Sequence, residues 1–113
     1  MKPLITQFFK YLEDTEGQKT PLKVKLLNPK EFKFTPEDLY VKGDLNLYSS
    51  PITSLPKGLK IEFSLNLIGT NITSLPKGLE VGRNIYLKYT PLAAKSNEEI
   101  YRMAPGIRGE IWR

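Results

Sequence analysis

The sequence contains no cysteine and no histidine. Thiolate nucleophiles, the usual zinc ligands and a Ser-His-Asp triad are therefore excluded, so an enzyme of this sequence would have to use Asp, Glu, Lys or Tyr. The lack of cysteine also excludes a disulfide framework and fits a reducing compartment. We expect a protein that uses no metal and no cofactor.

Long apolar runs are also missing, and none approaches the roughly 20 residues that a membrane helix needs. Residues 1–14 lack the pattern of a signal peptide because polar residues interrupt the apolar ones. We therefore expect a cytoplasmic protein that makes no membrane contact. Basic residues (17) outnumber acidic ones (12), and most are lysine. Readout of phosphates and bases favours arginine, so this excess predicts a solvated surface rather than a nucleic-acid site.

One octet, ITSLPKGL, occurs twice, at residues 52–59 and 72–79. Aligned on it, residues 45–64 and 65–84 are two copies of one unit, and residues 85–92 begin a third. Apolar residues recur in five columns of this alignment: Leu45/Leu65/Ile85, Leu47/Leu67/Leu87, Ile52/Ile72/Leu92, Leu55/Leu75 and Leu59/Leu79.

Each unit predicts a short strand followed by an irregular return. The alternation of Leu65, Asn66 and Leu67 is typical of a strand. Pro76 cannot continue a helix or a central strand, which argues against an amphipathic helix. In the turn, Ser50, Thr70 and Thr90 share a column in which a hydroxyl can bond the backbone. One unit cannot bury its apolar side alone, so stacked parallel strands should build one continuous core.

A degenerate copy of the unit lies upstream. Residues 32–43 match residues 52–63, with Phe32 over Ile52 and Val41 over Ile61. Before them, Val24 and Leu26 fill the strand columns if the following turn is one residue longer. These matches place the repeats at residues 23–92.

The phrase ITSLPKGLEVG, followed by N-I-Y-L and T-P-L, resembles short leucine-rich repeat proteins of tailed phages and bacteria. The resemblance implies an α+β solenoid: a short array of parallel strands with a helical cap at the N-terminal end and a helix-strand cap at the C-terminal end. It covers residues 39–92 well and implies a fold that hosts many binding partners. In the proteins that the chain resembles, the repeat ends in V-G-G. This chain departs from that pattern because Arg83 follows Gly82.

Residues 1–22 are expected to form the N-terminal cap and a linker of the single domain 1–113. Residues 3–13 place Leu4, Ile5, Phe8, Phe9 and Leu12 on one face of a helix. The alternatives are a membrane-surface helix, a partner-docking helix or a removable targeting helix. Few lysines flank the segment, which favours the cap. Residues 14–22 have the composition of the linker.

Residues 93–113 are expected to close the other end. Ser96 and Glu99 form a capping box that predicts a helix over 97–103. Pro105 and Gly106 should end this helix, and residues 109–112 should form a last strand that covers the edge. We expect Trp112 to shield the last unit rather than to serve a function.

The outward strand positions are the candidate binding surface, because the core does not use them. The middle outward column is predicted to hold Lys25, Asn46, Asn66 and Tyr86, flanked by two further columns: Asp44, Ser64 and Asn84, and Leu27, Tyr48, Ile68 and Lys88. Aromatic and aliphatic residues on a wet face are typical of an interface, although cross-strand packing explains them as well. The candidate partner-binding residues are Asn46, Tyr48, Asn66, Ile68, Tyr86 and Lys88.

These patterns favour a non-catalytic module that binds another protein through its outer strand face. The partner would be a host factor, in the host cytoplasm, if the chain is phage-encoded. The alternative is a structural or virion-associated assembly component. A nucleic-acid binder driven by the lysine excess is less favoured. An enzyme is least favoured, because Asp44 and Glu62 near the strand face have no evident partner.

Overall fold

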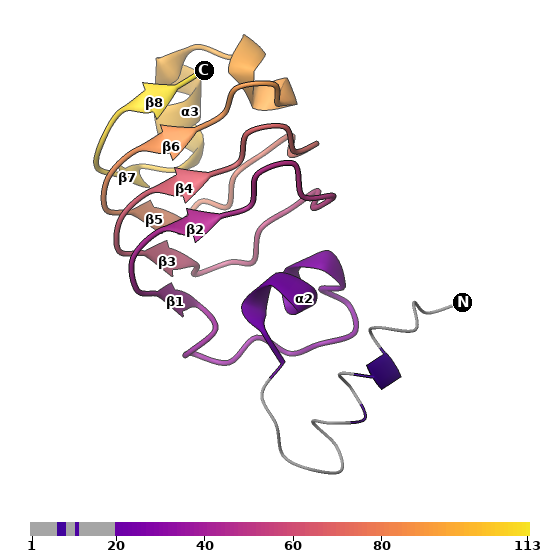
Figure 1. Ribbon diagram of the computed structural model, residues 1–113. Coiled ribbons are helices and arrows are strands. Elements are labelled where there is room, and N and C mark those ends of the chain that lie inside the picture. Colours follow the sequence, from indigo (N-terminus) through magenta and orange to yellow (C-terminus); the bar gives the residue numbers. More distant parts are fainter. Residues whose placement is uncertain (1–6, 9–10, 12–19) are drawn as a thin grey trace.

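Two parallel four-stranded sheets form the centre of the protein. The computed structural model describes residues 7–8, 11 and 20–113. Figure 1 shows the strands as two stacked rows, with the strands of the two rows alternating along the chain. The first sheet comprises β1 (Tyr40–Val41), β3 (Lys60–Ile61), β5 (Glu80–Val81) and β7 (Gly106–Ile107). The second comprises β2 (Leu45–Asn46), β4 (Leu65–Asn66), β6 (Ile85–Tyr86) and β8 (Ile111–Trp112).

The strand register follows the sequence repeat. Leu45 pairs with Leu65, and Leu65 pairs with Ile85, as the alignment predicts. In the first sheet Val41 pairs with Ile61, which confirms the upstream copy at residues 32–43. The repeat therefore sets which residues lie beside one another in both sheets.

All five apolar columns lie in the core. Leu65, Leu67 and Ile72 are fully buried, and Leu79 is as well. The predicted hydroxyl column supports the turn in two of the three copies, whereas at Ser50 the bond to the Leu47 carbonyl comes from the backbone N–H. Thr70 Oγ1 donates to the Leu67 carbonyl at 2.8 Å. Thr90 Oγ1 repeats this bond to the Leu87 carbonyl at 2.6 Å.

The bend between the two sheets tolerates Arg83 because the backbone ladder continues through it. Arg83 N donates to the Phe63 carbonyl at 3.0 Å, and Phe63 N donates to the Gly43 carbonyl at 3.0 Å. Gly82 is required at the start of this bend, because a Cβ there would collide with the carbonyl of Glu62. The second glycine of the repeat pattern is therefore dispensable here, whereas the first is not.

The prediction that Val24 and Leu26 occupy strand columns is wrong. Residues Leu22–Leu27 form the helix α2, which starts after Pro21. Leu22 and Leu26 stand four residues apart on one helical face and pack against the core. Lys25 and Leu27 are therefore not part of an outward strand column. Lys25 is buried (6% exposed) and pairs with Asp38, 2.6 Å away.

The C-terminal segment largely follows the prediction. The 3₁₀ helix η1 (Pro91–Ala94) precedes α3 (Asn97–Met103), and Ser96 Oγ accepts the Glu99 N–H at 3.2 Å, as a capping box requires. Ile100 of α3 is buried in the core. The helix is followed by β7, which the sequence did not predict, and then by β8 within the predicted strand region. Trp112 lies next to Tyr86 in β6.

Most of the predicted N-terminal helix lies outside the described residues, including Leu4, Ile5, Phe9 and Leu12, as does the larger part of the linker at 14–22. Gln7, Phe8 and Tyr11 are helical, and the Phe8 side chain is exposed. Across the part of the chain that the structure describes, no helix has the length and apolar character needed to span a membrane.

Candidate functional site

The six candidate residues all lie on the outer side of the second sheet or directly after its strands. We call the outer surface of β2, β4, β6 and β8 the strand face. Asn46, Asn66 and Tyr86 are neighbours in its middle column, where Asn46 pairs with Asn66 and Asn66 with Tyr86. Trp112 of β8 extends this column beyond Tyr86, so it is a member that the sequence analysis did not include.

Aromatic side chains are exposed at both ends of the strand face. Tyr48 is 62% exposed and Trp112 is 52% exposed, whereas Tyr86 is half-buried between the strands. Trp112 was predicted to shield the last unit, but half of its surface remains open to solvent. Ile68 is half-buried and Lys88 is exposed. The strand face therefore offers the mixture of apolar rings and polar groups that is common at protein interfaces.

The two candidate asparagines support the backbone as well as facing outward. Asn46 Oδ1 accepts the Tyr48 N–H at 3.0 Å, and Asn66 Oδ1 accepts the Ile68 N–H at 3.0 Å. Each asparagine thus fixes the residue two positions further on, as an Asx turn does. Their side-chain oxygens are occupied, and the amide NH₂ groups remain as hydrogen-bond donors without a partner among the described residues.

A second polar column joins successive strands of the strand face. Asp44 Oδ1 accepts the Ser64 N–H at 2.8 Å, and Ser64 Oγ accepts the Asn84 N–H at 3.3 Å. Asn84 Oδ1 in turn accepts the Glu110 N–H at 2.9 Å. Asp44 therefore supports the backbone of the next strand. The shared ability of these residues to accept a hydrogen bond is the signal in the alignment that identifies this column.

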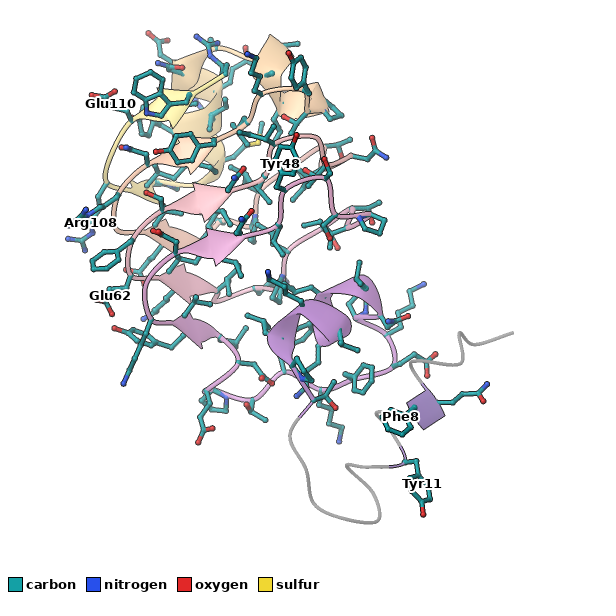
Figure 2. The ribbon with its side chains drawn as sticks, in the orientation of Figure 1. Phe8, Tyr11, Tyr48, Glu62, Arg108 and Glu110 are labelled. Atoms are coloured by element: carbon teal, nitrogen blue, oxygen red, sulfur yellow. The ribbon has the colours of Figure 1, made fainter. Side chains whose placement is uncertain are left out.

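A depression of about 210 Å³ opens between these two columns. Its described lining consists of Asp44, Leu45, Asn46, Ser64, Asn66 and Tyr86. Three of the candidate residues, Asn46, Asn66 and Tyr86, meet in it, whereas Tyr48, Ile68 and Lys88 lie beyond the carboxyl ends of the strands. Figure 2 shows Tyr48 and Glu110 at opposite ends of the strand direction, with the strand face between them.

Tyr89 is an exposed aromatic residue that the sequence analysis missed. It is 75% exposed, with the Lys88 Nζ 5.2 Å from its ring centroid. Its φ of 60° is in the left-handed region, which is costly for a bulky side chain. Ser49 and Gly69 occupy the same column and share this conformation, with φ values of 54° and 77°. Glycine at position 69 is the feature of the sequence that indicates a left-handed conformation at positions 49, 69 and 89.

The first sheet presents a different outer surface. Its charged side chains pair with one another: Lys60 Nζ lies 3.1 Å from Glu80 Oε2. At the bend, the Arg83 guanidinium lies 4.5 Å from the Phe63 ring centroid, close enough for a cation–π contact. The predicted solvated face holds for Lys57 and Lys77, which are exposed, but not for the buried Lys25.

The pair of Lys25 and Asp38 is structural. Lys25 Nζ also donates to the Lys33 carbonyl at 3.0 Å, and Asp38 Oδ2 accepts the Thr35 N–H at 2.9 Å. Burial raises the pKa of the Asp38 carboxyl, but the hydrogen bonds from Lys25 and Thr35 and the charge of Lys25 outweigh burial and hold the pKa below its ordinary value. The network connects α2 to the segment before β1.

The described residues contain no group of three or more His, Cys, Asp or Glu side chains that could hold a metal ion. No family model matches the chain, and the searches of curated proteins and of solved structures found no match. The resemblance to leucine-rich repeat proteins therefore depends on the repeat residues themselves.

Proposed function

We propose that this chain is a short leucine-rich repeat solenoid of bacterial or phage type that binds another protein through its strand face, without catalysis. α2 and α3 serve as the caps at the two ends of the array. The observation that carries the proposal is the set of aromatic residues on the strand face or directly after its strands: Tyr48, Tyr86 and Trp112. The core is formed by the inner columns and does not use them.

The chemistry of the strand face favours a protein partner. Tyrosine and tryptophan provide large contact areas and a polar group, and they are enriched among residues that dominate binding energy. Asp44 and Glu110 lie on the same face, where they would repel a phosphate backbone. If the chain is phage-encoded, the partner is a host factor in the host cytoplasm.

The second candidate is a component of a larger assembly, including a virion. It is favoured by β8, the last strand of its sheet, which carries the exposed Trp112. An open sheet edge beside an apolar ring is a common site of association between chains. This candidate predicts self-association that depends on concentration and weakens in Trp112→Ala, which analytical ultracentrifugation would measure.

The proposal is tested by affinity capture from nuclease-treated bacterial lysate with the wild type, Tyr48→Ala/Tyr86→Ala and Tyr40→Ala. Tyr40 is the control because it is an exposed tyrosine on the first sheet. We expect one partner to be retained by the wild type and by Tyr40→Ala and lost by the double variant. Equal retention by all three folded proteins would reject the strand face as the binding surface.

A further inference from the structure

The depression on the strand face has a local charge opposite to that of the whole chain. The net charge of the chain is +5, yet the one charged residue among the described residues that line the depression is Asp44. The remaining polar groups of the lining are neutral, namely two amides, one aliphatic hydroxyl and one phenol. A complementary ligand would therefore carry a positive charge at the position of Asp44.

The Asp44 carboxylate is held in place and is open on one side. Its Oδ1 accepts the Ser64 N–H at 2.8 Å, which fixes the side chain against β4. Asp38, Glu80 and Glu99 lie in ion pairs, with Lys25, Lys60 and Lys95 respectively. Asp44 has no such pair among the described residues, and it is exposed. A fixed carboxylate with a free oxygen is suited to a charge-assisted hydrogen bond from a ligand.

The two asparagine amides supply donors beside this carboxylate. Because Oδ1 of Asn46 and Oδ1 of Asn66 accept backbone N–H groups, the NH₂ groups are the part of each amide that remains for a ligand. The residues are register partners on adjacent parallel strands, whose spacing is about 4.8 Å. Side-chain amide donors of this kind can bond acceptor groups of a ligand, such as the main-chain carbonyls of a peptide.

Tyr86 completes the depression with an aromatic wall. It is half-buried, so its ring is held by its neighbours rather than free in solvent. Aromatic faces attract cations, and the planar guanidinium of arginine stacks on them more readily than the strongly hydrated ammonium of lysine. A carboxylate beside such a ring therefore favours arginine.

We propose that the depression binds an arginine side chain on an extended segment of the partner protein. The guanidinium pairs with Asp44 and stacks on Tyr86, while main-chain carbonyls of the segment accept hydrogen bonds from Asn46 and Asn66. This inference rests on the proposed function and names the chemistry by which the partner is recognised.

The test is a titration of the full chain, labelled with ¹⁵N, with the blocked tripeptide acetyl-Gly-Arg-Gly-amide. The matched ligand is the same peptide with citrulline, which keeps the shape of arginine and removes its charge. We expect saturable shifts of the amide signals of Ser64, Asn66 and Tyr86 at millimolar peptide. The citrulline peptide should bind about fivefold or more weakly, because a hydrogen bond to a charged group contributes about 1 kcal/mol or more.

Two variants distinguish the contribution of Asp44 to peptide affinity from the effect of removing any acid from the strand face. Asp44→Asn keeps an acceptor for the Ser64 N–H and should weaken the arginine peptide about fivefold, to the level of the citrulline peptide. Glu110→Gln removes an acid from the same face but outside the depression and should leave the affinity unchanged. Both variants should give wild-type spectra at residues remote from the substitution.

Three results would overturn the arginine pocket: no shifts at these amides, equal binding of both peptides, or preferential binding of a neutral oligosaccharide added as a third probe. Affinity capture with Asp44→Asn distinguishes rejection of the arginine pocket from rejection of the strand face as the binding surface. A partner that Asp44→Asn retains and Tyr48→Ala/Tyr86→Ala loses would leave the strand face intact and reject the pocket. A partner that both variants retain would reject the proposed function itself.

Discussion

The two sheets share one core but differ on their outer surfaces. On the first sheet, the exposed charged side chains of Lys60 and Glu80 pair with each other, and Tyr40 is its exposed aromatic residue. On the second sheet, Tyr48 and Trp112 stand in solvent, and the polar side chains support the backbone. The first surface thus carries an ion pair between neighbouring strands, whereas the second combines several exposed or half-buried aromatic rings with polar side chains that bond the backbone.

If the two sheets differ only in their outer surfaces, their buried residues should contribute equally to the free energy of unfolding. Leu59 precedes β3 and Leu67 follows β4, and both are fully buried. We expect Leu59→Ala and Leu67→Ala each to lower the free energy of unfolding by about 2–5 kcal/mol, because each leaves a cavity. Urea denaturation would measure this. A loss below about 1 kcal/mol at either site would show that one sheet is poorly packed.

The next largest effect concerns the buried pair that lies before the first sheet. Asp38→Asn should lower the free energy of unfolding by about 1–3 kcal/mol at pH 7, because it leaves Lys25 buried without its counter-charge. The folded-state pKa of Asp38 is depressed, so its contribution is complete above the ordinary value of 3.8 and is lost as the pH falls through the folded-state value.

Denaturation of wild type and Asp38→Asn at several pH values would check this linkage. The difference between the two proteins should shrink as the pH falls below 3.8. A difference that stays constant through this range would show that the charge of Asp38 does not stabilise the fold. Glu62→Gln, at an exposed acid, is the control for general effects of acid.

A smaller effect of opposite sign is expected beside the strand face. Tyr89→Gly should raise the free energy of unfolding by about 0.5–1 kcal/mol, because glycine adopts the left-handed conformation at lower cost than tyrosine. Tyr89→Ala removes the ring but keeps the costly conformation, so it should give no gain. Thermal unfolding of the three proteins separates these cases. Loss of the partner in both variants would show that Tyr89 contributes to binding.

The smallest effects should come from the outer surfaces themselves. Tyr48→Ala should change the free energy of unfolding by less than about 0.5 kcal/mol, because its ring is exposed. Glu80→Gln should cost up to about 1 kcal/mol and less at high salt, since it breaks the exposed pair with Lys60. The free energy of unfolding of both variants, measured at low and at high salt, would test these expectations. Marked destabilisation by Tyr48→Ala would mean that this ring packs against the fold.

The repeat predicted the strand register and the buried columns because each column must satisfy the same packing in every unit. It did not predict α2, because the two-residue spacing of Val24 and Leu26 fits a strand, whereas the four-residue spacing of Leu22 and Leu26 fits a helix. The helix packs both Leu22 and Leu26 against the core. The repeat also missed β7, because the helix α3 interrupts the period before Gly106 and Ile107 complete the first sheet.

The candidate site was predictable in position but not in detail. Alternation along the strands identified Asn46, Asn66 and Tyr86 as outward neighbours. The use of the asparagine oxygens by Tyr48 and Ile68 depends on local backbone geometry that residue types do not specify. Tyr89 escaped notice because its conformation is visible in the sequence only through the glycine one unit earlier.

The column of Asp44, Ser64 and Asn84 makes the length of this array adjustable. Each of these side chains accepts the backbone N–H of the equivalent residue one row further along, so every row carries its own connector to the next. A tandem duplication of residues 65–84 would add one acceptor and one donor together and leave both ends of the chain unchanged. Gene duplication can thus lengthen the strand face row by row, with no new residues required at the junction.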